Sequence, residues 1–420
     1  MDETFQKPEL LAPAGGFDQL RYAIYFGADA VYLAADRFGL RQRATNFALD
    51  QIPAAVAYAH QHGVQVHLTC NALMDAHDLE ALPPYLEALA AAGVDALIIS
   101  DLGALRLAKK YAPGVALHVS TQASCSNAQA AHAWYDMGAR RIVCAREMSL
   151  EAIATMRRDI PADLELEVFV QGAMCMAVSG RCLISDYLTG RSGNKGHCTQ
   201  PCRWSYTLEE EKRPGEHFPV EEDERGTYIM NSKDMNMLAH LDDLRAAGVN
   251  SLKIEGRNKK AFYVATVVNA YRQVLDGADP ALFASELETI SHRPYSTGFF
   301  YGYAQQAPEE SGYIQGYLLA ATVTACEPLG ADVADAADAA GEQQWLVRAE
   351  CYNRFCEGDV LEVLSPHCPV ARVRVRGLQL LHSGGSVEAV AVANRSQSIY
   401  GFVVSAPLAP HAILRIQSQG

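Results

Sequence analysis

A short pattern that recurs through the first part of the chain constrains the fold more than any other feature of the sequence. In each copy a helical stretch ends at a glycine, and a short apolar run follows after one or two small or polar residues; the glycines are Gly27, Gly63, Gly93, Gly138 and Gly248. A glycine in the left-handed conformation commonly ends a helix, and a continuous apolar run is typical of a strand buried on both faces. The pattern therefore predicts βαβ units and a parallel sheet.

Counting the apolar runs narrows the choice of α/β fold. There are eight: Leu10–Ala14, Ala30–Leu33, Val66–Thr69, Ala96–Ser100, Leu117–Thr121, Arg141–Ala145, Leu166–Val170 and Leu252–Ile254. Eight runs favour a closed (β/α)8 barrel of the TIM type over an open sheet, and such barrels place their chemistry at the C-terminal ends of the strands. The polar residues at those ends are Asp36, Asn71, Asp101, Gln122, Glu147, Gln171 and Glu255, with Arg257 just beyond. Together they mark a face for a site, although loops are polar in any case.

Two segments break the pattern. About eighty residues separate Gln171 from Leu252, and they hold an insertion at about residues 172–232 with an acidic stretch from Glu209 to Arg225. Trp204–Leu208 and Thr227–Met230 flank that stretch and are expected to form a hairpin. From residue 311 the sequence becomes β-rich, with the runs Tyr317–Thr324, Trp345–Tyr352, Asp359–Leu364, Val370–Val375, Val387–Ala393 and Phe402–Val404. We therefore expect a barrel domain over residues 1–310 and a small C-terminal β-barrel or sandwich over residues 311–420.

Composition and charge limit the classes of protein to consider. The 35 Lys and Arg against 49 Asp and Glu give a net charge of -14, which argues against a surface coated in positive charge but leaves room for a local basic groove. The N-terminus has no basic and apolar leader pattern, and no apolar run reaches the roughly 18–20 residues of a membrane span. We expect a cytoplasmic protein without a membrane partner. Its 11 cysteines are then unlikely to form a disulfide framework.

Four cysteines in the insertion give the sharpest signal. Cys175, Cys182, Cys198 and Cys202 are spaced C-x6-C-x15-C-x3-C in a glycine-rich stretch. Four thiolates suit zinc or an iron–sulfur cluster, and because only the last two cysteines are spaced like a zinc knuckle, a cluster is favoured. The alternative is four loop thiols without a metal. The other seven cysteines show no grouping typical of a metal site.

Several motifs in order resemble the collagenase-like peptidase family (peptidase family U thirty-two). They are Glu9–Gly15, Leu40-Arg41 with Asn46-Phe47, Ser120–Gln122, Glu167–Cys175, Ser179–Ser185 and Lys253–Arg257. The match covers roughly residues 8–300, and the β-rich tail is similar to the family's C-terminal domain. Despite the family name, the chain most resembles the prephenate-dependent tRNA uridine hydroxylases, which convert the wobble uridine to 5-hydroxyuridine. This resemblance implies an iron–sulfur cluster, expected to be [4Fe-4S], held by the four cysteines.

The resemblance also directs the choice of site residues. Hydroxylation of a pyrimidine needs a cofactor, an oxygen source and an electron donor that the sequence does not identify. The two carboxylates of prephenate require cations, for which the candidates are Arg41, Arg43 and Arg257, with Arg146 behind them. Asn71 and Gln122 are further candidates for substrate binding. Three carboxylates are equally plausible as the base: Glu167, Glu255 and Asp101.

The RNA partner is expected to be the anticodon loop of a tRNA, whose target uridine can be unstacked at low cost. Two basic groups could bind its phosphates. One is Arg257 with Lys259 and Lys260, and the other is a stripe of Arg372, Arg374 and Arg376 expected on one face of a single strand. A solvated sheet face explains that stripe equally well.

Three other functions stay open. Hydroxylation of ribosomal RNA or of a quinone precursor would use the same cluster. A peptidase is less well supported, since the sequence has no His-Glu-x-x-His or Gly-x-Ser-x-Gly motif, and in an adjacent Cys–His pair such as Cys198 beside His197 the two side chains rarely face each other. An accessory protein that carries a cluster while another protein catalyses the reaction is the third.

Overall fold

The structure, a computed structural model, describes residues 7–40, 46–175, 177–204, 207–209, 212, 214–215, 217–219, 232–303, 314–329 and 343–418. Contacts divide the chain into two compact units: Met1–Ser285 with His292–Ile314, and Glu286–Ser291 with Gln315–Gly420. The expected boundary between residues 310 and 311 lies outside the described residues. The short segment Glu286–Ser291 joins the second unit because Thr289 accepts a backbone hydrogen bond from Tyr317 and Glu286 binds Arg415 at 2.7 Å.

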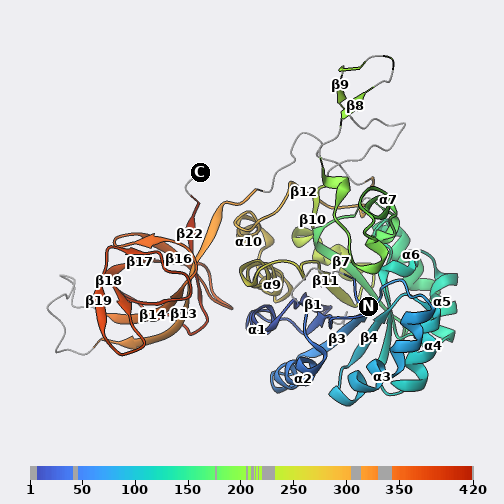
Figure 1. The fold of residues 1–420 in the computed structure, drawn as a ribbon, viewed down its shortest axis with the longest axis horizontal. Helices are drawn as coiled ribbons and strands as arrows, with labels where there is room; N and C mark the ends of the chain where they lie inside the picture. Colours follow the sequence, from blue (N-terminus) through green and yellow to red (C-terminus); the bar gives the residue numbers. More distant parts are fainter. Residues whose placement is uncertain are drawn as a thin grey trace. The chain divides into compact units, whose positions relative to one another are not determined.

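The first unit is a closed parallel barrel, as predicted (Figure 1). Its strands are β1 (Glu9–Pro13), β2 (Ala30–Leu33), β3 (Gln65–Cys70), β4 (Ala96–Ile99), β5 (Ala116–Val119), β6 (Arg141–Val143), β7 (Glu165–Ala173) and β11 (Ser251–Ile254). Each strand pairs in parallel with the next, and β11 pairs with both β7 and β1, with Leu252 opposite Leu10 and Val168. All eight predicted strands are present.

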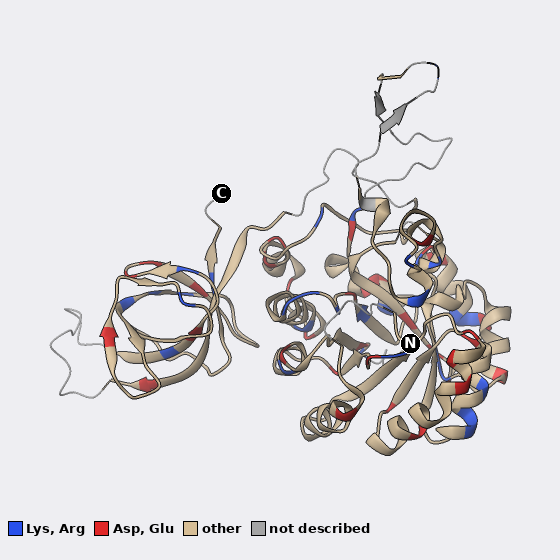
Figure 2. Cartoon of the chain, viewed as in Figure 1, with Lys and Arg blue, Asp and Glu red and all other residues tan. Residues whose placement is uncertain are grey.

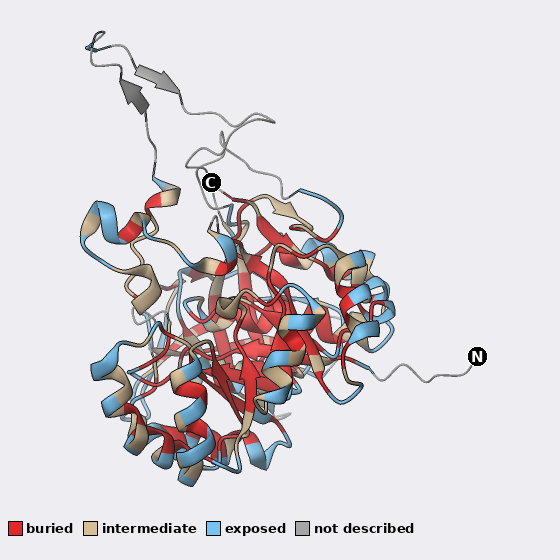
Figure 3. Cartoon of the chain, turned by 90° about the vertical axis from the view of Figure 1, so that its right-hand side faces the viewer, coloured by how far each residue is buried: buried red, intermediate tan, exposed pale blue. Residues whose placement is uncertain are grey.

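Helices on the outside of the barrel connect the strands. They are α1 (Phe17–Tyr25), α2 (Ile52–Gln61), α3 (Ala76–Ala92), α4 (Leu102–Tyr111), α5 (Ala128–Asp136), α6 (Leu150–Asp159), α8 (Leu241–Ala246) and α9 (Ala261–Leu275), followed by α10 (Pro280–Leu287). The predicted helix ends are accurate where caps define them. Asp75 caps the start of α3 by accepting the Asp78 backbone N–H, and Gly93 ends it with a φ of 80°. Figure 3 shows the buried residues concentrated on the strands and the exposed residues on the outer helices.

The interior of the barrel differs from the usual branched-aliphatic filling because charged side chains occupy part of it. Leu11, Ala30, Tyr32 and Ile98 form one apolar cluster. Elsewhere in the interior, a buried ion-pair network is made of Glu9, Arg141, Glu167 and Lys253. Burying an ion costs several kcal/mol unless it is paired, so the network depends on its mutual contacts.

The insertion follows β7. Short β10 (Asp234–Asn236) returns antiparallel to β7 and pairs with β12 (Tyr295–Ser296). The described residues of the cysteine-bearing segment, 175 and 177–204, form α7 (Ile184–Thr189) and short 3-10 turns. The 3-10 turns of this unit are η1 (Leu49–Gln51), η2 (Thr121–Ala123), η3 (Val178–Gly180), η4 (Gly193–Lys195), η5 (Pro201–Arg203) and η6 (Leu238–His240). A hairpin is present, but β8 (Thr207–Glu209) pairs with β9 (His217–Pro219), inside the stretch that we expected to be a loop. The expected partner, residues 227–230, lies outside the described residues.

The second unit is an antiparallel sheet that curls around its own core (Figure 1). Its order is β17-β16-β22-β13-β14-β21-β18-β19, with a separate pair of β15 and β20. The strands are β13 (Tyr317–Pro328), β14 (Trp345–Cys351), β15 (Phe355–Cys356), β16 (Val360–Leu364), β17 (Ala371–Arg374), β18 (Arg376–Leu381), β19 (Val387–Ala389), β20 (Val392–Ala393), β21 (Ile399–Val404) and β22 (Ile413–Gln417). Strands β15, β18 and β22 were not predicted. The central β22 contributes Leu414 to the core and Arg415 to a buried contact with Glu286 and Glu362.

Two further properties concern the surface. In the view of Figure 2, Lys and Arg are interspersed with Asp and Glu over the helices of the barrel unit. No helix among the described residues combines the length and the apolar character needed to cross a membrane.

Candidate active site

A cavity of about 610 Å³ lies at the C-terminal ends of the barrel strands, under the cysteine-bearing segment. Strand ends supply one part of its lining and the insertion supplies the other. The cavity brings together eight of the predicted site residues: Asn71, Gln122, Glu255, Arg257, Cys175, Cys182, Cys198 and Cys202. The strand-end reasoning and the cysteine spacing therefore lead to one place in the structure.

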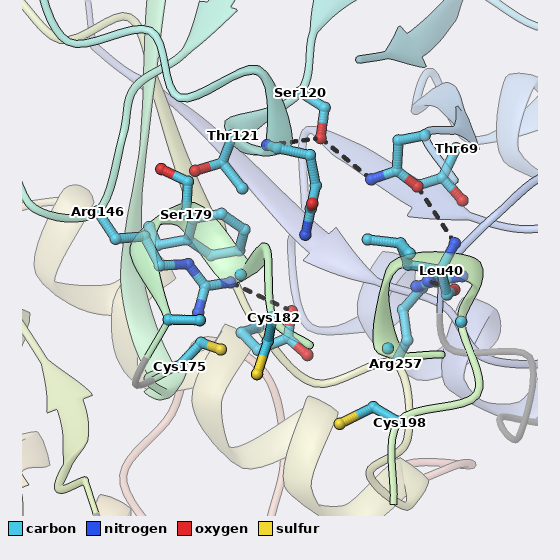
Figure 4. Close-up of a pocket in the computed structure, with 18 of the residues that line it drawn as sticks. Leu40, Thr69, Ser120, Thr121, Arg146, Cys175, Ser179, Cys182, Cys198 and Arg257 are labelled. Atoms are coloured by element: carbon cyan, nitrogen blue, oxygen red, sulfur yellow. Dashed lines mark hydrogen bonds and ion pairs between the residues drawn. The ribbon is translucent and has the colours of Figure 1, made fainter. Parts of the chain in front are cut away.

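The four cysteines come from one irregular segment. Cys175 is exposed and the other three are half-buried, and Figure 4 shows the sulfurs of Cys175, Cys182 and Cys198 directed toward a common region. Two thiols accept hydrogen bonds from the backbone two residues further on: the Ile184 N–H donates to Cys182 Sγ at 3.4 Å, and the Gln200 N–H donates to Cys198 Sγ at 3.3 Å. These hydrogen bonds hold the two sulfurs in place relative to the backbone of the segment.

Polar contacts inside the segment fix its shape. The Asn194 side chain accepts the Cys182 N–H and donates to the Cys182 carbonyl, both at 3.1 Å. The buried Ser185 hydroxyl contacts the Arg191 carbonyl at 2.6 Å and accepts the Thr199 N–H at 3.0 Å. These bonds replace the regular ladder that a strand or a long helix would provide, so the loop has a defined conformation.

Other contacts anchor the segment to the barrel. The two carboxylate oxygens of Glu147 accept the Ser179 N–H at 2.7 Å and the Ser179 hydroxyl at 3.1 Å. At Gly180, where φ is 76°, a Cβ would lie 2.7 Å from the Gln122 side-chain nitrogen, so a larger residue would strain the backbone and displace the Gln122 amide. Glu147 was noted only as a polar residue after a strand, and its role as an anchor was not predicted. Sequence position gives no signal for a contact of this kind.

An amide-lined wall lies opposite the cysteines. Asn71 donates from Nδ2 to Ser120 Oγ at 3.1 Å and accepts the Leu40 N–H at 3.3 Å, as the dashed lines in Figure 4 show. The Gln122 N–H donates to the same serine hydroxyl at 3.3 Å. These contacts hold two amide side chains, Asn71 and Gln122, where they can hydrogen-bond to a ligand in the cavity.

Cations outnumber carboxylates in the lining. Lys253 lies at the floor, where its ammonium is 4.5 Å from the Tyr32 ring centre and donates to Glu167 at 2.6 Å. The Arg146 guanidinium lies 3.9 Å from the Phe169 ring centre. Arg257 approaches from the other side and donates to the Leu40 carbonyl (Figure 4). Among the described residues of the lining, Glu255 is the one carboxylate, so the field of the cavity favours an anionic ligand.

Sequence reasoning found this cationic character only in part. Arg257 was predicted to bind substrate and Arg146 was placed behind it, whereas Lys253 was noted only within a family motif. Alternate residues of a barrel strand point into the barrel, so Ser251, Lys253 and Glu255 on and just after β11 share one side. This alternation could have identified Lys253 as an inward-facing cation. Arg41 and Arg43 lie outside the described residues.

The three candidate bases lie in different environments. Glu255 lines the cavity, with its carboxylate 3.5 Å from the Tyr32 hydroxyl and 3.9 Å from Arg146. Asp101 is not among the lining residues, and it caps α4 by accepting the Ala104 N–H at 3.0 Å. The position of Asp101 therefore supports a structural role rather than the catalytic role suggested for it.

Glu167 is fully buried in the barrel interior and is absent from the cavity lining. Burial alone would raise its pKa, but Lys253 at 2.6 Å and Arg141 at 3.1 Å outweigh this effect and lower the pKa to about 2. A carboxylate with such a pKa is a poor proton acceptor at neutral pH. The structure thus favours Glu255 over the other two candidates.

The predicted basic groups are largely engaged in contacts within the protein. Lys259 lies 5.0 Å from the Tyr263 ring centre, and Arg372 pairs with Glu362 at 3.0 Å. Arg372, Arg374 and Arg376 are exposed in alternation with buried Val373 and Val375, as expected, but Arg376 begins β18 and is not on the same strand as the other two. The single-strand interpretation is wrong because the chain passes from β17 to β18 across one residue.

A second cluster of possible ligands lies below the cavity. His67, His118 and Glu167 have ligand atoms within 4.8 Å of one another. Burial lowers the pKa of His67 to about 4, so this imidazole is neutral at pH 7. Lys253 and Arg141 already neutralise Glu167, and their positive charges disfavour a metal cation beside it.

Comparison with known proteins extends these observations. The sequence profile of peptidase family U32 matches residues 15–310. The tRNA hydroxylation protein P of Escherichia coli (strain K12) is 35% identical over 410 residues, which cover 86% of each chain. A 23S rRNA 5-hydroxycytidine synthase of the same organism is 39% identical over 276 residues, 66% of this chain and 40% of that protein. A collagenase of Porphyromonas gingivalis is 32% identical over 312 residues, 70% of this chain and 73% of that protein. Since the profile matches well over half of the sequence, this chain belongs to peptidase family U32, as its motifs predicted.

Proposed function

We propose that this protein is an RNA-hydroxylating enzyme that converts the wobble uridine of tRNA to 5-hydroxyuridine, with prephenate as co-substrate and an iron–sulfur cluster as cofactor. The observation that carries the proposal is the meeting of four thiols, two amide side chains and three cations around one cavity. The relatives named for tRNA and ribosomal RNA hydroxylation support the choice of an RNA substrate. The 86% coverage of the tRNA hydroxylation protein favours tRNA over ribosomal RNA.

Cys175, Cys182, Cys198 and Cys202 would hold the cluster, and two features of the segment support this assignment. Four thiolates on one zinc ion, at about 2.3 Å each, would bring the sulfurs within about 4 Å of one another. Among the described residues, the one group of three or more metal-ligating side chains with ligand atoms within 4.8 Å is the histidine–glutamate cluster below the cavity. The thiols are thus more widely spread than one ion requires, and the backbone N–H donors at Cys182 and Cys198 are of the kind that tunes cluster potentials.

The cluster would supply Lewis-acid or one-electron chemistry, which ordinary side chains do not offer. Replacing the hydrogen at carbon five by a hydroxyl oxidises the ring by two electrons, so the oxygen source or a separate redox partner would have to accept them. A [4Fe-4S] form fits four cysteine ligands. The chain's own residues would bind and orient the two substrates and hold the proton that leaves the ring.

Prephenate has two carboxylates, and the cavity offers Arg257, Arg146 and Lys253 to bind them. Asn71 and Gln122 would hydrogen-bond to the edge of an unstacked uracil, since a side-chain amide both donates and accepts. Glu255 is the lining carboxylate, and we assign to it the proton that carbon five of the ring loses when oxygen replaces hydrogen.

Peptide hydrolysis is less well supported, although one relative is a collagenase. A cysteine peptidase needs a histidine that faces the thiol. His197, adjacent to Cys198 in sequence, lies in a separate small depression with Arg37 and Lys195 and is absent from the lining of the main cavity.

Mass spectrometry of tRNA nucleosides tests the proposal. The strains are a deletion strain and the same strain complemented with wild type, with Cys175→Ala or with Cys368→Ala as a matched control from the second unit. We expect 5-hydroxyuridine and its derivatives to disappear on deletion and to return with wild type and Cys368→Ala but not with Cys175→Ala. Unchanged 5-hydroxyuridine in the deletion strain, with no second copy of the gene, would refute a role in tRNA hydroxylation.

A further inference from the structure

We propose that the outer surface of the cysteine-bearing segment is the docking site for a single-stranded RNA loop. We call this surface the cysteine-segment face and define it by the exposed large apolar side chains Val178, Leu183, Tyr187, Leu188 and Trp204. Tyr187 would stack on a nucleotide next to the target base, while Arg181 and Arg191 would contact phosphates. The inference rests on the proposed function, because it names the surface through which the RNA would be bound.

The exposure of this face has no explanation within the described fold. Tyr187 is 89% exposed, Leu183 is 70% exposed and Val178 is 65% exposed. Side chains of this size normally pack against a core, and a group of them left in water typically marks an interaction site. The segment is anchored to the barrel by hydrogen bonds of Ser179 and Asn194, so the barrel core does not depend on Val178, Leu183 or Tyr187.

The charge of the segment is opposite to that of the whole chain. Residues 175–204 contain four Lys or Arg and one Asp, which gives +3, whereas the chain as a whole carries -14. Lys195 is paired with Asp75 and Asp78, but Arg181 and Arg191 are exposed on either side of α7. Aromatic side chains with arginines nearby are the features by which proteins bind unstacked nucleotides, and an otherwise acidic protein needs such a local site to attract a polyanion.

The segment is also in the right place and sufficiently rigid. It lines the cavity through its cysteines, so a nucleotide inserted into the cavity leaves its neighbours beside the same segment. The α7 helix that carries Tyr187 is held from beneath, because the buried Ser185 bonds to the Arg191 carbonyl and accepts a hydrogen bond from Thr199. A rigid platform loses little conformational entropy when a base stacks on it.

A protein that delivers electrons is the competing occupant, since it too would need to approach the cysteines. The exposed Tyr187 beside the exposed Arg181 and Arg191 favours RNA, because an aromatic ring can stack on a base while arginines contact phosphates. The two occupants make different predictions for RNA affinity, which a binding experiment can measure directly.

The experiment uses the full-length protein with its cluster reconstituted and verified by absorbance, and an unmodified anticodon stem–loop followed by fluorescence anisotropy. We expect Tyr187→Ala to weaken binding by about tenfold, and Tyr187→Trp to bind as wild type because stacking is retained. Arg181→Glu should weaken binding and reduce its salt dependence. Two matched controls should bind as wild type: Leu282→Ala, which removes a side chain that is also 70% exposed, and Arg106→Glu on α4.

Wild-type affinity in both Tyr187→Ala and Arg181→Glu would overturn the inference. If these variants bind RNA normally but their cluster is reduced more slowly by a protein donor, the face binds that donor and the inference is equally overturned. The proposed function fails independently, when deletion leaves 5-hydroxyuridine unchanged. Normal 5-hydroxyuridine formation with wild-type RNA affinity in the variants would refute the docking face alone.

Discussion

Replacement of Glu167 by glutamine tests whether the buried ion pairs are needed to hold the barrel together. Glu167 is inaccessible to solvent and accepts from Lys253 at 2.6 Å and from Arg141 at 3.1 Å. Arg141 keeps two other carboxylate partners, Glu9 at 2.6 Å and Glu165 at 2.7 Å. The substitution therefore mainly leaves Lys253 buried without a counter-charge.

Breaking a buried pair from one side typically costs about 3–5 kcal/mol, and we expect the free energy of unfolding of the Glu167→Gln variant to fall by about that amount. The measurement is urea unfolding followed by circular dichroism, with Glu165→Gln as a control that alters a half-exposed carboxylate in the same network. The control should lose about 1 kcal/mol or less, since exposed pairs contribute little.

The double variant Glu167→Gln with Lys253→Met separates the ion pair from simple packing. If the orphaned ammonium causes the loss, removing it should restore part of the stability, and the coupling energy between the two sites should be clearly favourable. A loss below about 1 kcal/mol in Glu167→Gln, or strictly additive effects in the double variant, would show that Lys253 does not depend on this carboxylate.

Three further predictions concern neighbouring sites. Gly180→Ala should lower the iron bound per chain more than Gly190→Ala, because both residues have positive φ but only the Cβ at 180 would lie 2.7 Å from a side-chain nitrogen; equal iron contents would contradict this. Glu255→Gln should abolish nucleoside hydroxylation and leave RNA affinity intact. Asp101→Asn should retain activity and lower the free energy of unfolding by about 1 kcal/mol or less, because it weakens a helix cap. Loss of activity in Asp101→Asn would reverse the assignment of Glu255 as the base. The lowered pKa of Glu167 gives stability that is full above its ordinary value of 4.5 and is lost as pH falls toward about 2, so acid unfolding of Glu167→Gln should depend less on pH in that range.

The sequence predicts the barrel well because each part of the pattern has a local physical cause. Glycine ends the helices, and continuous apolar runs identify strands buried on both faces, so all eight strands were found. The C-terminal sheet was predicted less completely. Strand β22 was missed because it is only five residues long and carries Arg415 at its centre, and the partners of Arg415 are Glu286 and Glu362, far away in the sequence.

The candidate site divides in the same way. Residues whose role follows from position along a strand, such as Asn71, Gln122 and Glu255, lie in the cavity as expected. The surroundings of Glu167 were not predicted, because alternation along β7 places it inside the barrel and nothing local indicates that Lys253 and Arg141 neutralise it there. Such a network is built from several strands and becomes visible only when the barrel closes.

The position of the cysteine-bearing segment explains how a common barrel brings four thiols to its cavity. The segment replaces an ordinary connection after β7, so its thiols lie over the strand ends where the cavity is open. Its conformation depends on Glu147 and Gly180 contacts with the barrel, and its thiols depend on hydrogen bonds within the segment. The cation at the floor depends in turn on Glu167 beneath it. The site is therefore supported from two directions: the buried ion pairs set its charge, while the anchored segment sets the positions of its sulfurs.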